Sequence, residues 1–66
     1  SMSIDQIKLH IGEWAWTSDS GVKLTKSRGW HGPYRIEKVT KAGLVLLENY
    51  DYQVKPSSIK LVEDQA

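Results

Sequence analysis

A chain of 66 residues has the length of one small domain, and its composition excludes several classes of protein. There is no cysteine, which excludes disulfides and thiolate-metal sites, and no apolar run approaches the roughly 20 residues that cross a bilayer. The formal net charge is only +1, yet residues 18–41 hold six Lys and Arg against two Asp and Glu, which is +4. The rest holds three basic and six acidic residues, which is −3. This distribution favours either one positive face or an ordinarily solvated surface of mixed charge.

The N-terminal residues predict a lead-in followed by a strand. The opening Ser-Met pair resembles the remnant of a cleaved expression tag, so residues 1–6 are predicted to be a tag remnant and a disordered lead-in. Ile7, Leu9 and Ile11 then alternate with polar residues, the period of a half-buried strand, and Gly12 interrupts the pattern.

The next segment, "EWAWT" (13–17), continues in extended form before a polar loop. Trp14 and Trp16 lie on one face of this strand, although the pattern does not say which face points inward. Residues 18–29, "SDSGVKLTKSRG", are rich in Ser, Gly and Lys and predict a long mobile loop or a loose hairpin arm.

The second half of the chain predicts short strands separated by turns. "YRIEKV" (34–39) alternates as a strand, "KAG" forms a tight turn at Gly43, and the apolar run "LVLLEN" (44–49) predicts a strand buried on both sides. Asn49 and Asp51 form the next turn, and "YQV" (52–54) is a further short strand. Pro56 begins a single helical turn, "IKLV" (59–62) is the last strand, and residues 63–66 form a disordered tail.

Five short strands, a long first loop and a single 3-10 turn before the last strand favour an all-β fold. The most economical closure is a small five-stranded SH3-like barrel spanning residues 7–62, because closing the sheet removes its exposed edges.

Four segments together carry a family resemblance: "GEWAW" (12–16), "GWHGPYRIEKV" (29–39), "GLVLLEN" (43–49) and "YQVKPSSIKLV" (52–62). This set resembles the C-terminal SH3-like domain of retroviral and gypsy-type retrotransposon integrases over roughly residues 11–62. The most specific piece is Trp30-x-Gly32-Pro33-Tyr34-x-Ile36, and the ending at residues 56–60 adds weaker support. The modest net charge departs from the clearly basic character of such domains and is what a host gene descended from a retrotransposon would show.

The resemblance implies a nuclear, non-catalytic module that follows an integrase-like catalytic core in a longer protein. Such domains contribute weak, sequence-tolerant DNA binding, contacts within the integrase multimer and, in some members, docking to chromatin proteins. The catalytic carboxylates belong to a different domain of those proteins, so no enzymatic activity, cofactor or small-molecule substrate is expected of this chain.

DNA binding is the leading functional hypothesis, because the cations of the basic segment suit phosphate contacts. Trp30 would act as a stacking or anchoring residue, although packing over the barrel end is the more common role for such a ring. The proposed DNA-binding residues are Lys23, Lys26, Arg28, Trp30, Arg35, Lys38 and Lys41.

A protein-interaction module is the alternative, through self-association, strand addition to a chromatin partner or a Tudor-like aromatic cage for methylated lysine. The candidate cage residues are Trp14, Trp16, Trp30, Tyr34, Tyr50 and Tyr52, unless these rings instead form the core. No metal site is expected, since His10 and His31 are the only imidazoles and lie in separate elements. No serine has a nearby histidine and carboxylate, so no catalytic residues are predicted either.

Overall fold

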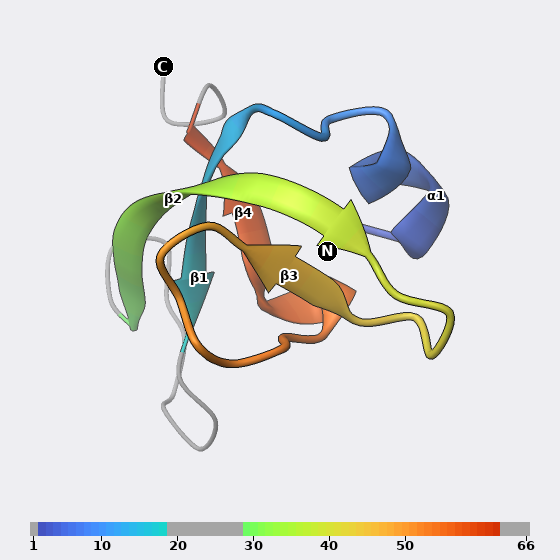
Figure 1. The fold of residues 1–66 in the computed structure, drawn as a ribbon. Coiled ribbons are helices and arrows are strands. Elements are labelled where there is room, and N and C mark those ends of the chain that lie inside the picture. The colour runs from blue at the N-terminus through green and yellow to red at the C-terminus, as the bar shows by residue number, and fades with distance from the viewer. Residues whose placement is uncertain (1, 19–28, 63–66) are drawn as a thin grey trace.

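The computed structural model describes residues 2–18 and 29–62, and most of its regular structure is short antiparallel strands (Figure 1). The strands form one sheet in the order β3-β2-β1-β4. In chain order the elements are α1 (Ile4–Lys8), β1 (Trp14–Ser18), β2 (Trp30–Val39), β3 (Val45–Leu47), η1 (Pro56–Ser58) and β4 (Ile59–Leu61). The predicted all-β character and the single 3-10 turn before the last strand are therefore confirmed.

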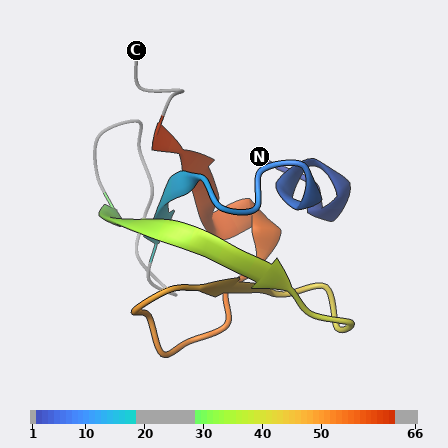
Figure 2. The ribbon, with the colours of Figure 1, turned by 45° about the horizontal axis from the view of Figure 1, so that its top comes forward.

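Strand β2 organises the fold because it belongs to two half-sheets at once. Its first half pairs with β1, from Ser18↔Trp30 to Trp14↔Arg35, and its second half pairs with β3, from Ile36↔Leu47 to Val39↔Val45. The register shifts by one residue in each half, which marks two bulges. Bulges increase local twist and bend a strand. Accordingly, β2 curves across the molecule and carries the chain from one half-sheet to the other (Figures 1 and 2).

The predicted five-stranded closed barrel is not reproduced by the hydrogen-bonded strands. Within the described residues there are four strands, and the sheet is open between β3 and β4. Where residues 52–54 were predicted to form a strand, a single antiparallel bridge joins Val54 to Val45 through two backbone hydrogen bonds of 2.8 and 3.0 Å.

The N-terminal strand prediction was wrong, because residues 4–8 form helix α1 instead. Ser3 caps the helix: its Oγ accepts from the Gln6 N–H at 3.3 Å, and the Gln6 Oε1 accepts from the Ser3 N–H at 2.9 Å. This reciprocal pair is a capping box, which satisfies two otherwise unpaired donors. Ile7 is fully buried while Leu9 is 80% exposed, so the apparent alternation does not define a buried face. Residues 4–6 of the predicted lead-in lie in the first turn of α1.

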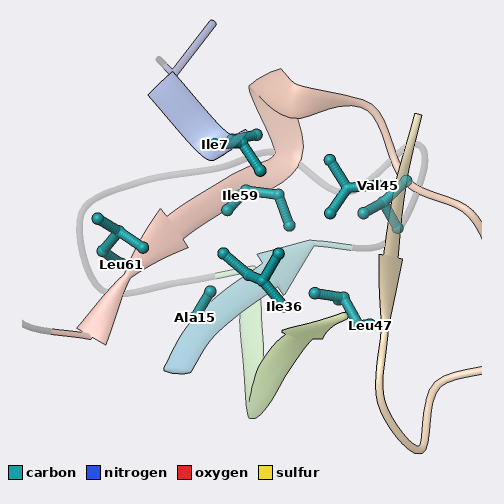
Figure 3. Packing of buried hydrophobic residues seen from close by; sticks show 8 residues of the cluster. Ile7, Ala15, Ile36, Val45, Leu47, Ile59 and Leu61 are labelled. Atoms are coloured by element: carbon teal, nitrogen blue, oxygen red, sulfur yellow. The ribbon is translucent and has the colours of Figure 1, made fainter. Parts of the chain in front are cut away.

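The core lies between the two half-sheets and is aliphatic. Side chains from α1 and from all four strands converge there (Figure 3). The buried hydrophobic residues are Ile7, Ala15, Ile36, Val45, Leu47, Val54, Ile59 and Leu61, with Tyr34 and Tyr50 partly buried at the margin. Burying aliphatic side chains contributes about 1.5–3 kcal/mol each for the larger ones, which is substantial for a domain of this size.

The predicted turns are found at their expected residues. Gly43 has φ +80°, and its N–H donates to the Thr40 carbonyl at 3.0 Å, while Asn49 occupies the left-handed region at φ 62°. Strand β3 differs from its prediction, because Val45 and Leu47 are buried whereas Leu46 is only half-buried. The loop predicted at residues 18–29 lies, except for its two ends, outside the described residues, as does the predicted tail at 63–66.

Candidate functional site

The burial of alternate residues in strand β1 shows which of its side chains face outward. Ala15 and Thr17 are both fully buried, and alternate residues of a strand point to opposite faces. Trp14 and Trp16 therefore lie on the outer face, where Trp14 is 49% exposed and Trp16 is half-buried. The inner face of β1 is therefore formed by an alanine and a threonine instead of by the two tryptophan rings.

Two cations, on the strands either side of β1, lie over tryptophan rings of this outer face. Arg35 of β2 pairs with Trp14 in the register, and its Cζ lies 4.6 Å from the centroid of the Trp14 ring. Lys60 of β4 pairs with Trp16, and its Nζ lies 4.7 Å from the centroid of the Trp30 ring. The outer surface of β2, β1 and β4 thus holds a group that we call the tryptophan face: Trp14, Trp16, Trp30, Arg35 and Lys60.

Both cation–π contacts are within the range of about 6 Å over which a cation is attracted to an aromatic face. Arg35 also approaches a carboxylate, with 3.8 Å between its Nε and the Glu48 Oε2. The Arg35 side chain thus has Trp14 on one side and a carboxylate within ion-pair distance. Within the described residues, the indole Nε1 of Trp16 is buried without a hydrogen-bond partner.

The structure brings together only some of the predicted DNA-binding residues. Trp30 and Arg35 belong to the tryptophan face, while Lys38 is exposed near the far end of β2 and Lys41 lies in the following turn. Lys23, Lys26 and Arg28 fall outside the described residues.

Lys60 was missed by the sequence reasoning, although a signal for it existed. It lies between Ile59 and Leu61, which are both buried, so strand periodicity puts it on the outer face of β4. Periodicity does not give the order of the strands, so it could not predict that Lys60 of β4 contacts Trp30 of β2.

The six rings proposed for an aromatic cage are divided between two places. The three tryptophans lie on the tryptophan face, while the three tyrosines gather with a histidine in what we call the tyrosine cluster: His31, Tyr34, Tyr50 and Tyr52. The ring centroids are 4.9 Å apart for Tyr34 and Tyr50, 5.6 Å for Tyr50 and Tyr52, and 5.5 Å for His31 and Tyr50. The Tyr34 hydroxyl also lies 3.4 Å from the His31 Nδ1.

Other kinds of site find little support among residues 2–18 and 29–62. No three His, Cys, Asp or Glu side chains in these ranges gather as metal ligands would. His10 Nδ1 is 2.8 Å from the Glu13 Oε2 in the turn before β1, while His31 belongs to the tyrosine cluster. In the same ranges, no helix has the length and apolarity needed to cross a membrane.

The predicted strand-addition surface has a structural counterpart at the sheet edge. Strand β4 stands last in the strand order and has β1 as its hydrogen-bonded neighbour in the described part of the chain. It contains three residues, and short edge strands pair weakly with other chains. Strand addition to a chromatin partner or to a second copy stays a prediction.

Comparison of the chain with protein-family models, with curated proteins and with solved structures gives no match.

Proposed function

We propose that this chain is a non-catalytic nucleic-acid-binding domain with the fold of an SH3-like barrel of the integrase C-terminal type. Three features support the barrel: β2 is shared between two half-sheets, Val54 bridges to β3 where a fifth strand would lie, and η1 precedes the last strand. The integrase-like segments quoted above support the family, a nuclear location and an origin in a retrotransposon.

The observation that carries the functional proposal is the tryptophan face. Three indole rings and two cations lie on one outer surface formed by three adjacent strands, with Arg35 over Trp14 and Lys60 over Trp30. Proteins that bind single-stranded nucleic acid without reading its sequence combine stacking rings with cations that follow the backbone. On this surface, bases would stack on the exposed area of Trp14, and Arg35 and Lys60 would contact phosphates.

The proposal predicts weak binding with little sequence preference. Phosphate contacts position a protein without distinguishing bases, and every base offers a face for stacking. Each phosphate that a cation neutralises adds about 0.7 to the slope of log affinity against log salt for single strands, and about 0.9 for duplex DNA. Lys23, Lys26 and Arg28, which lie outside the described residues, stay part of the proposed set of phosphate-contacting cations because of their charge.

The test is fluorescence anisotropy of a labelled single strand and of its duplex, titrated with the chain at low salt and again at rising salt. We expect saturable binding, weakening with salt, and tighter binding of the single strand. The Trp14→Ala variant should bind the single strand about 5- to 150-fold more weakly, corresponding to the roughly 1–3 kcal/mol that stacking contributes per base. The control is Leu9→Ala, which removes an exposed apolar side chain from a different part of the surface.

Two results would overturn the proposal. One is the absence of binding at about 100 μM protein and low salt, where non-specific contacts are strong enough to register. The other is equal loss of affinity in Trp14→Ala and Leu9→Ala, which would show that the ring makes no specific contribution.

A further inference from the structure

The guanidinium of Arg35 has two different neighbours on the outer surface of the sheet. Its Cζ lies 4.6 Å from the centroid of the Trp14 ring, and its Nε lies 3.8 Å from the Glu48 Oε2. The indole attracts the cation but provides no oxygen ligand, so a phosphate can bind Arg35 while the ring stays in place. A carboxylate, in contrast, uses the same N–H donors that a phosphate oxygen would use.

The pairing of β2 with β3 fixes Glu48 beside Arg35. The Glu48 N–H donates to the Arg35 carbonyl oxygen at 2.9 Å, one step beyond the cross-strand pair Ile36↔Leu47. Ile36 and Leu47 are both buried, so the residues next to them point to the outer surface. A slip in register would expose these two core side chains, which keeps Glu48 and Arg35 next to each other.

The ion pair between Arg35 and Glu48 is weak enough for another anion to replace the carboxylate. The separation of 3.8 Å is longer than a charge-assisted hydrogen bond, and the two side chains are 45% and 49% exposed. Exposed ion pairs shift an equilibrium by only about 1.5- to 5-fold, and salt screens them. A phosphate that binds a guanidinium through two parallel hydrogen bonds makes a stronger contact, but here it first has to displace Glu48.

We propose that Glu48 competes with nucleic-acid phosphates for Arg35 and thereby limits the affinity of the tryptophan face. The inference rests on the proposed function, and it adds a residue that opposes binding to the residues that support it. In the unaltered chain, the contact of Arg35 with a phosphate replaces its ion pair with Glu48, so the net gain is small. Neutralising the Glu48 carboxylate should therefore raise the affinity.

The experiment measures the affinity of variants for a labelled single strand by anisotropy at several salt concentrations. Glu48→Gln keeps the size of the side chain, removes its charge and should bind about 1.5- to 5-fold more tightly at low salt. Its slope of log affinity against log salt should be steeper by up to about 0.7, because no displaced carboxylate takes up a cation on binding. The matched control is Asp51→Asn, which changes the net charge equally at an exposed residue outside this ion pair.

Arg35→Gln tests whether Glu48 acts through Arg35. This variant should bind more weakly than the unaltered chain, and adding Glu48→Gln to it should change the affinity no more than Asp51→Asn does. Both side chains of the pair are about half exposed, so the variants should fold, and urea unfolding checks this.

Two results would overturn the inference and leave the proposed function standing. One is equal affinity of Glu48→Gln and Asp51→Asn, which would show that only the net charge matters. The other is an equal gain from Glu48→Gln with and without Arg35, which would show that the carboxylate repels phosphate directly and does not compete for the guanidinium. If neither the unaltered chain nor any variant binds at about 100 μM protein and low salt, the proposed function fails, and the inference fails with it.

Discussion

Replacement of Ile7 by alanine tests whether helix α1 is an integral part of the fold. The Ile7 side chain is fully buried in the core that α1 shares with the four strands. Truncating a buried isoleucine to alanine lowers the free energy of unfolding by about 2–5 kcal/mol. The core of a domain this small supplies only about 3–5 kcal/mol of net stability, so Ile7→Ala should remove about 40% of it or more.

The assay is thermal and urea unfolding followed by circular dichroism. A loss of 2 kcal/mol should lower the melting temperature by about 8–16 °C, since each kcal/mol corresponds to about 4–8 °C in a domain of this size. Ile7→Val is the graded variant that should remain folded, with an expected loss of about 0.5–1.5 kcal/mol. Leu9→Ala is the matched control, expected to change stability by less than about 0.5 kcal/mol because Leu9 is 80% exposed.

The comparison also separates a helix from a strand at residues 4–8. In a half-buried strand, positions 7 and 9 would share the buried face and both substitutions would be costly. Equal losses in Ile7→Ala and Leu9→Ala would therefore refute the docking of α1, and an unchanged midpoint in Ile7→Ala would refute the burial of Ile7.

Two further substitutions test local features of the sheet. Gly32→Ala should destabilise the domain by about 1–3 kcal/mol in urea unfolding, because Gly32 has φ +125° and a new Cβ would lie 3.1 Å from the Tyr34 backbone nitrogen. Gly12→Ala, at φ +91° with nothing within 4 Å of the new Cβ, is its control, and an equal loss in both would show that crowding contributes nothing. Thr17→Val should leave stability unchanged or raise it by up to about 1 kcal/mol, since in the described structure the buried Thr17 hydroxyl oxygen has no hydrogen-bond partner. A clear loss of stability in Thr17→Val would indicate that this hydroxyl is hydrogen-bonded in solution.

Sequence reasoning located most strands but misread the N-terminus. The alternation of Ile7, Leu9 and Ile11 suggested a strand, although Ser3 and Gln6 already had the spacing of a capping box. A helix of five residues is too short to show a clear helical period, so the cap was the stronger signal.

For the candidate site, the sequence indicated that aromatic and basic residues take part, but it did not show which of them lie together. The rings of Trp14 and Trp16 were expected to share a face, and they do. The six candidate cage rings, however, fall into two groups, the tryptophan face and the tyrosine cluster, which the sequence did not distinguish. Lys60 was absent from the predicted set because its contact with Trp30 links residues far apart in the chain.

The amino-acid sequence by itself determined the local features: the strands with regular alternation, the turns at Gly43 and Asn49, and the helical turn that begins at Pro56. These depend on backbone preferences and on neighbours within a few residues. Only the tertiary structure decided that β1 buries Ala15 and Thr17 and presents its tryptophans to solvent. Alternation tells which side chains share a face, but the buried face is set by the strands on either side and by the space between the half-sheets. The same holds for the tyrosine cluster, since the bend of β2 and the path of the chain after β3 bring its rings together.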